Sequence, residues 1–269
     1  MNFKELVLLE RGFEDVVFSE KDHSYKIRGE KAYSSVTQLL KKYEKPFDTK
    51  KLSKIVANRQ GVLEEDIVHL WDFKRDYACL KGTLFHLYVE NFLQKKRSPL
   101  NKNEIEDFVK NHREYITTEE FYNDVASYIS NFNNFYEWWK ADHILVRPEL
   151  VVGDVATGVC GCVDNLSLNC KTGELVIFDY KSNKEIKQKS KDRLLGMLSH
   201  LEATTLVKYS LQMALYSEII ERNTPFKISD NKIVWVGGSS YELISCLDMK
   251  QEAKALLNQV ELQKGVDIK

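Results

Sequence analysis

The chain has 269 residues, of which 43% are hydrophobic and 29% are charged, values that are ordinary for a folded soluble protein and unlike those of a disordered chain. Lysine and arginine number 39 against 40 acidic residues, which excludes a protein whose overall charge attracts nucleic acid. Any such attraction has to come from a local basic surface, because phosphates respond to nearby cations rather than to the sum over the chain.

The N-terminal region carries Lys4, Glu5 and Glu10 around a short apolar run and has no small-residue cleavage site, so a secretory signal is not expected. No apolar segment reaches the ~20 residues that cross a bilayer, and no membrane association is expected. The five cysteines lack the paired spacing of a zinc ribbon or a redox centre. We expect free thiols and a cytoplasmic location.

The first third of the chain predicts a hairpin followed by helices. Residues 16–18 and 24–27 are strand-like and flank a polar turn, so a hairpin is expected to open the protein. Helical spacing of apolar residues follows over residues 35–43, again after Pro46, and over residues 64–94.

Two breaks are expected in this helical region. Gly82 is expected to interrupt the run over residues 64–94, and Pro99 with the asparagine-rich stretch after it is expected to end it. A second helix is predicted over residues 119–140. Its many aromatic side chains are expected to form core rather than a platform for nucleic-acid bases.

From residue 144 the pattern changes from helical to strand-like, with turns at 153–154 and 171–173. Three strands are expected at residues 145–152, 159–168 and 175–181, followed by a helix at 205–221. Two more strands, at 232–236 and 241–246, flank a glycine-serine turn, and an amphipathic helix closes the chain. This order predicts a mixed sheet flanked by helices. No repeat or low-complexity linker marks a domain boundary.

Two acidic residues are placed where neighbouring strands can bring them together. Asp164 lies in Gly161-Cys162-Val163-Asp164 on one strand, and Asp179 lies at the end of the next strand, two residues before Lys181. Paired carboxylates would hold Mg²⁺ or Mn²⁺, which offsets charge on a phosphodiester and lowers the pKa of an attacking water. Asp179 and Lys181 share a strand face, so the lysine could orient that water or help to deprotonate it. For this triplet alone, a surface Asp-Lys pair is the alternative.

Two helices contribute further candidates. His86 and Glu90 are four residues apart on a predicted helix and therefore project from one face, and an imidazole beside two carboxylates makes Mn²⁺ as acceptable as Mg²⁺. Gln212 and Tyr216 share a face of the later helix. Taken singly, the histidine could be an ordinary surface or core residue, and the second pair could be the polar edge of a packed helix.

Together, these motifs resemble the RecB-like branch of the PD-(D/E)XK nuclease superfamily. Its motifs G-x-x-x-H-x-x-x-E, G-x-x-D, D-x-K and Q-x-x-x-Y occur in order at residues 82–90, 161–164, 179–181 and 212–216. The sequence also resembles phage and bacterial exonucleases related to the mitochondrial genome maintenance exonuclease. This likeness is carried by residues 22–25, which include His23, by residues 35–37 and by Trp71. The resemblance covers about Val16 to Ile220.

The resemblance implies an α/β fold, namely a restriction-endonuclease-like αβββαβ core with a mixed central sheet and a helical N-terminal elaboration. It divides the chain into an N-terminal hairpin and helical elaboration at 1–78 and a nuclease core at 79–269. The residues it implies as metal ligands are His86, Asp164, Asp179 and the backbone carbonyl of Tyr180.

The resemblance also implies that Lys181 is the catalytic lysine, with Gln212 and Tyr216 positioning the site or the DNA. Glu90 and Glu149 are weaker candidates. Glu149 lies where related nucleases often have an acidic residue on the first core strand, but it could equally be an ordinary surface carboxylate. No iron-sulfur cluster is expected, because only Cys246 lies in the C-terminal region where related enzymes have three cysteine ligands.

The implied activity is that of a Mg²⁺- or Mn²⁺-dependent DNA exonuclease that acts on single-stranded or end-accessible DNA and leaves 5′-phosphate and 3′-hydroxyl ends. A structure-selective flap endonuclease and a catalytically silent DNA-binding module of the same fold are the alternatives. Residues 181–193 contain six basic and two acidic residues, which favours either a segment that follows a phosphate backbone or a solvated loop. Protein partners are not indicated.

Overall fold

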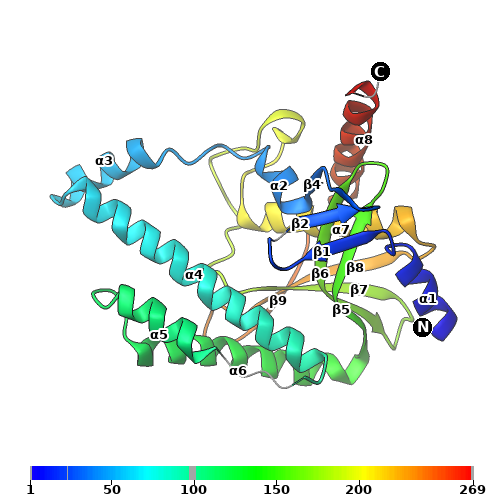
Figure 1. The fold of residues 1–269 in the computed structure, drawn as a ribbon, viewed down its shortest axis with the longest axis horizontal. Coiled ribbons are helices and arrows are strands. Elements are labelled where there is room, and N and C mark those ends of the chain that lie inside the picture. The colour runs from blue at the N-terminus through cyan, green and yellow to red at the C-terminus, as the bar shows by residue number, and fades with distance from the viewer. Residues whose placement is uncertain (1, 23, 97–100, 268–269) are drawn as a thin grey trace.

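The computed structural model describes residues 2–22, 24–96 and 101–267. The expected positions His23 and Pro99 lie outside these residues. The elements shown in Figure 1 are, in chain order, α1 (Phe3–Arg11), β1 (Val16–Ser19), β2 (Ser24–Ile27), β3 (Glu30–Lys31), β4 (Ser34–Ser35), α2 (Val36–Lys41), α3 (Thr49–Gln60), α4 (Glu64–Leu93), α5 (Lys102–Asn111), α6 (Thr118–Asp142), β5 (His143–Asp154), β6 (Val159–Asn169), β7 (Leu175–Lys181), the 3₁₀ turn η1 (Gly196–Leu198), α7 (Thr205–Asn223), β8 (Ile228–Trp235), β9 (Glu242–Ser245) and α8 (Lys250–Asp267).

The central sheet is mixed. Strands β5, β6 and β7 are antiparallel neighbours, β7 pairs with β8 in parallel, and β9 closes the sheet as an antiparallel partner of β8. The succession α6, β5, β6, β7, α7, β8 confirms the predicted αβββαβ order and the mixed sheet. A separate antiparallel sheet of β1, β2 and β3 contains the predicted hairpin.

Both faces of the sheet are covered by helices. Phe178 and Tyr180 of β7 pack with α4 and α6 through Phe85, Phe132 and Phe135, so the dense aromatics of α6 are core, as expected. Ile177 of the same strand packs on the other side with α7. A strand buried on both faces reads as a continuous apolar run, which is why β7 has the predicted bounds. Figure 1 shows α4, α5 and α6 gathered on one side of the sheet.

The edge of β6 that faces β7 contains a gap. Strand β5 follows the opposite edge of β6 along its length. On the facing edge, β4 pairs only with Val159 and Cys160, and β7 pairs only from Asn165 onward. Residues 161–164 therefore lie between β4 and β7, where no named strand pairs with them on that edge among the described residues.

The N-terminal prediction was wrong in one respect, because a helix and not the hairpin opens the chain. In α1, the Asn2 side chain accepts a hydrogen bond from the Glu5 backbone N–H, and the Glu5 carboxylate accepts one from the Asn2 backbone. Such reciprocal capping stabilises a short helix. Leu9, with no exposed surface, fixes α1 to the core.

Three further differences have local causes. Helix α4 runs through Gly82 without a break, since about 1 kcal/mol of glycine penalty is small against the burial of a thirty-residue helix. Helix α5, which was not predicted, starts at the Asn101 cap and buries Ile105. Strand β5 continues through Gly153, so the turn predicted at 153–154 follows the end of this strand instead. A Cβ at Gly153 would lie 2.9 Å from Cys160 Sγ, so glycine is needed here for close packing against β6.

None of the helices in the described ranges combines the length and apolar character needed to span a membrane. All five cysteines are free thiols.

Candidate metal centre and active site

The candidate site lies where β6 and β7 separate. The last paired residues are Asn165 and Phe178, and the next residues toward the open end are Asp164 and Asp179. There the Tyr180 backbone N–H donates to Asp164 Oδ2 at 2.8 Å. The carboxylate thus takes the place of a backbone acceptor in the ladder, which holds it in a fixed direction.

The Tyr180 carbonyl points toward the same gap. Val236 N–H donates to the Lys181 carbonyl at 2.9 Å on the β8 side of the strand. Because backbone groups of successive residues in a strand point to alternate edges, the N–H and carbonyl of Tyr180 face the β6 side. The Tyr180 ring, in contrast, is buried, and its hydroxyl accepts a hydrogen bond from Asn165.

His86, Glu149 and Asp164 converge on one point. One donor atom from each lies within 4.8 Å of the others, and all three side chains are partly exposed. His86 Nδ1 is 3.6 Å from Asp164 Oδ2. Ligand atoms bound to one cation at about 2.0–2.6 Å can be no more than roughly 4–5 Å apart, so these three donors could hold a single ion.

The backbone of β5 is distorted at Glu149. Its φ is 45°, in the left-handed region, and the register, with Pro148 opposite Asn165 and Leu150 opposite Val163, sets it opposite Asp164 of β6. A residue other than glycine held in this conformation costs about 1–3 kcal/mol, and such strain clusters at functional sites. This register and backbone conformation together place Glu149 in the group with His86 and Asp164.

The carboxylates of Glu149, Asp164 and Asp179 repel one another, and their burial reduces the solvation that would weaken this repulsion. Burial first, and the nearby Asp164 charge second, raise the pKa of Glu149 to about 8. Glu149 Oε2 also accepts a hydrogen bond from the Cys162 thiol at 3.2 Å. Burial and the Asp164 charge also raise the pKa of Asp179, although the Lys181 ammonium opposes them. A divalent cation would offset this crowding, so the donor set fits such an ion.

Glu149→Gln is expected to stabilise the metal-free protein at pH 8 but not at pH 5. In the unfolded chain, the Glu149 carboxyl ionises with a pKa of about 4.3, whereas in the folded protein its pKa is raised to about 8. Between these two pH values the unfolded chain loses the proton more readily than the folded protein, so Glu149 lowers the stability of the fold as the pH rises. Thermal melts in EDTA at both pH values measure this, with roughly 2–4 °C expected for each kcal/mol removed. The matched control is Glu106→Gln on the exposed face of α5. An unchanged or lower Tm of Glu149→Gln at pH 8 would contradict the crowding of carboxylates.

Lys181 and Asp179 form a close pair beside this group. Lys181 Nζ is 2.5 Å from Asp179 Oδ2, and the aspartate is 1% exposed. The contact is a short ion pair, and Asp179 Oδ2 has no other polar partner among the described residues. Burial lowers the pKa of Lys181, but Asp179 and Asp164 together raise it above its ordinary value. Lys181 is therefore an ammonium, suited to charge stabilisation and to orienting a water.

Gln212 and Tyr216 meet on α7 and explain the glycine of the G-x-x-D motif. Gln212 Nε2 donates to the Tyr216 hydroxyl at 3.0 Å, and the tyrosine is buried. A Cβ at Gly161 would lie 2.3 Å from Tyr216 Cε1. Only glycine lets this ring pack against β6 in the gap between β4 and β7, so the two motifs are parts of one contact.

The structure brings some predicted residues together and leaves others outside the donor group. Asp179 does not belong to the three donors within 4.8 Å of one another, and its role as a ligand stays a prediction, as does that of the Tyr180 carbonyl. Glu90 accepts a hydrogen bond from Gln94 at 2.9 Å and adds to the charges that raise the pKa of Glu149.

Tyr209 and Cys162 contact the site but were not singled out from the sequence. Lys181 Nζ lies 4.8 Å from the centre of the Tyr209 ring, within the range of a cation–π interaction. The spacing of three residues between Tyr209 and Gln212 on α7 was the signal that could have found it. For Cys162, the signal was its place two residues before Asp164 on one strand.

Neither a family model nor a curated protein sequence matches the chain. Among solved structures, the chain is similar to the crystal structure of a "putative exonuclease" from Eubacterium rectale, with 17% sequence identity and a TM-score of 0.37. The match covers 70% of this chain and 65% of that chain, so it spans just under two thirds of the length of the solved protein.

Proposed function

We propose that this protein is a metal-dependent nuclease of the RecB-like PD-(D/E)XK type that hydrolyses phosphodiester bonds in DNA. The observation that supports this most strongly is the convergence of His86, Glu149 and Asp164 beside the Lys181–Asp179 pair. A strand end that carries carboxylates next to a buried ammonium has little purpose in a purely structural or DNA-binding role.

In the proposed site, His86, Glu149 and Asp164 would hold Mg²⁺ or Mn²⁺, and the Tyr180 carbonyl and Asp179 would be further ligands. A bound ion of this kind supplies neutralisation of phosphate charge and a lower pKa for an attacking water. Lys181, kept protonated by Asp179, orients that water and stabilises charge that develops on the phosphate. Tyr216 packs against Gly161 and thereby positions β6.

We further propose that the substrate is single-stranded DNA or DNA with a free end, cut to 5′-phosphate and 3′-hydroxyl products. Residues 1–78 would form an elaboration around a core at 79–269. In Figure 1, α3 and the first half of α4 extend away from the sheet. Helix α4 is continuous across the proposed boundary, so the two parts would share one rigid helix.

The first test uses the wild-type protein. Linear single-stranded DNA labelled at either end is expected to be degraded in Mg²⁺ or Mn²⁺ and to stay intact in EDTA. A covalently closed circle of the same sequence should survive under all conditions, because it has no end. Cutting of the circle would favour a structure-selective endonuclease. Absence of cleavage of every DNA and RNA tested in either metal would contradict the proposed function.

A further inference from the structure

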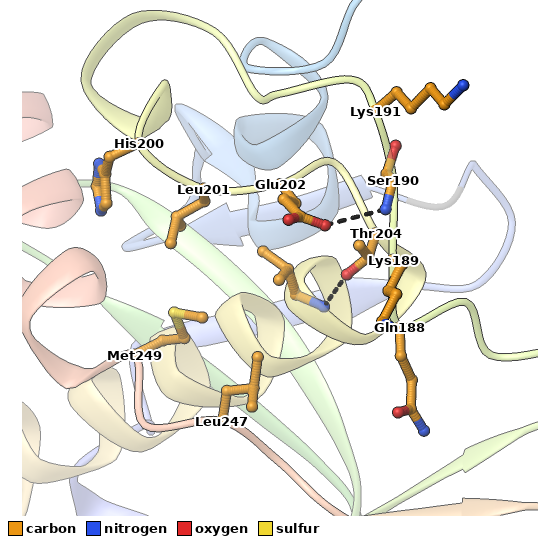
Figure 2. A pocket seen from close by; sticks show the side chains of 11 residues that line it. Gln188, Lys189, Ser190, Lys191, His200, Leu201, Glu202, Thr204, Leu247 and Met249 are labelled. Carbon is orange, nitrogen blue, oxygen red and sulfur yellow. Dashed lines mark hydrogen bonds between the residues drawn. The ribbon is translucent and has the colours of Figure 1, made fainter.

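A groove distinct from the candidate metal centre lies at the start of α7, and we call it the α7 groove. It has a volume of about 790 Å³ and is lined by residues 188–191, residues 200–202, Thr204, Val207, Leu247 and Met249. Figure 2 shows it between the loop that precedes α7 and the segment that joins β9 to α8.

The floor of the α7 groove is apolar. It consists of Leu201, Val207, Leu247 and Met249, and Leu247 is 42% exposed. The loop above it is fixed by backbone hydrogen bonds, since Ser190 N–H donates to Glu202 Oε2 at 3.0 Å (Figure 2) and Leu206 N–H donates to the Lys187 carbonyl at 3.1 Å. An apolar surface is thus held open to solvent.

The rim of the α7 groove is cationic. Lys189 and Lys191 are exposed, and neither forms an ion pair with any residue in the described ranges, whereas Lys187 in the same loop pairs with Glu185. Lys191 lies at one end of the groove and points away from the other side chains drawn in Figure 2. The lining also contains one carboxylate, Glu202, which accepts a hydrogen bond from Ser190 N–H, so lysine ammonium groups outnumber carboxylates there by two to one. An apolar floor below two unpaired ammonium groups suits a ligand that has both a flat apolar part and negative charge.

The α7 groove is close to the candidate active site along the chain. The loop that forms its rim begins directly after Lys181. Thr204, the N-cap residue of α7, lines the groove, and Tyr209 of α7 lies under Lys181. Five residues of helix correspond to roughly 7.5 Å along its axis. At roughly 100° per residue, Thr204 and Tyr209 also lie about 140° apart around the axis, so a strand whose scissile phosphate lies at Lys181 would pass around the start of α7 to reach the groove.

We propose that the α7 groove binds a part of the single-stranded DNA substrate that lies away from the scissile phosphate. A base rests on the apolar floor and its phosphate lies near Lys189 and Lys191. This assignment rests on the proposed function, and it goes further by requiring an unpaired strand at this position, since the bases of a duplex are stacked and cannot lie on such a floor.

The test measures binding of a fluorescein-labelled single-stranded DNA 10-mer by anisotropy in EDTA, where a metal-dependent enzyme does not cut. The double variant Lys189→Glu/Lys191→Glu is expected to bind at least about tenfold more weakly. The slope of log K against log salt should become shallower by about 1.4, because each lost phosphate contact removes about 0.7 in a single strand. The matched control is Lys102→Glu/Lys110→Glu on exposed positions of α5, which should bind as the wild type does.

The apolar floor is tested separately with Leu247→Ser and an oligonucleotide whose residues lack bases. This substitution at an exposed position should weaken binding of the normal oligonucleotide several-fold and leave binding of the abasic one unchanged. The proposal would be overturned if Lys189→Glu/Lys191→Glu bound DNA as tightly as the wild type does. It would also be overturned if Leu247→Ser lost as much affinity for the abasic oligonucleotide as for the normal one.

The outcomes separate this proposal from the proposed function. If the wild type degrades linear DNA but the groove variants bind normally, the nuclease assignment stands and the groove assignment fails. If the variants lose binding as expected but the wild type cuts no nucleic acid in either metal, the groove is a DNA site of a protein that is not a nuclease.

Discussion

Lys181→Ala is expected to lower the rate of metal-dependent DNA cleavage by about 10²–10⁴-fold, the range typical for a group that stabilises charge or positions a proton in the transition state. The ammonium is 2.5 Å from Asp179 and mostly buried, so no other described cation can take its place without a rearrangement of β7. Single-turnover cleavage of linear single-stranded DNA measures the chemical step directly.

Two further variants make this test specific. Lys184→Ala removes an exposed lysine three residues later and should cut at nearly the wild-type rate. Lys181→Arg retains the positive charge that compensates the buried Asp179, so it should remain folded and still be slow, because a planar guanidinium does not replace an ammonium in position. A rate for folded Lys181→Ala within tenfold of the wild type would remove the lysine from the mechanism.

Asp164→Asn is expected to lower cleavage on the order of 10³-fold or more and to weaken Mn²⁺ binding by more than the 10–100-fold typical of residues that only support a ligand. The asparagine oxygen can still accept the hydrogen bond from Tyr180 N–H that the carboxylate accepts at 2.8 Å. The fold should therefore be retained while the negative charge is lost.

Calorimetric titration with Mn²⁺ and single-turnover cleavage at increasing Mn²⁺ test this second expectation. Part of the lost rate should return at high metal concentration, since the remaining ligands His86 and Glu149 still offer donors. Asp107→Asn on the exposed face of α5 serves as the control. Unchanged Mn²⁺ affinity in Asp164→Asn would show that this carboxylate does not bind the ion.

The fold could be predicted where burial creates a strong pattern. Strand β7 has the predicted bounds because residues 175–180 are all buried, and the change to charged residues marks its end. Helices α1 and α5 were missed because they are short and depend on caps and on a few contacts, such as those of Leu9 and Ile105. Neither feature gives a long periodic signal.

The candidate site was predictable where the motif residues lie on regular elements. Asp164 and His86 meet because β6 and β7 separate at the gap that the His86 helix faces. The sequence gives Glu149 little weight, since its place in the group depends on a left-handed backbone conformation in β5 and on the register that sets it opposite Asp164. No periodicity encodes such a distortion.

The most direct test of the central claim is a crystal of the wild-type protein grown with MnCl₂ and measured at a wavelength where manganese scatters anomalously. The account predicts an anomalous peak about 2–2.6 Å from donor atoms of His86, Glu149 and Asp164, with Lys181 next to it. A crystal saturated with Mn²⁺ that shows no peak among these three side chains, or a peak bound elsewhere on the molecule, would contradict it.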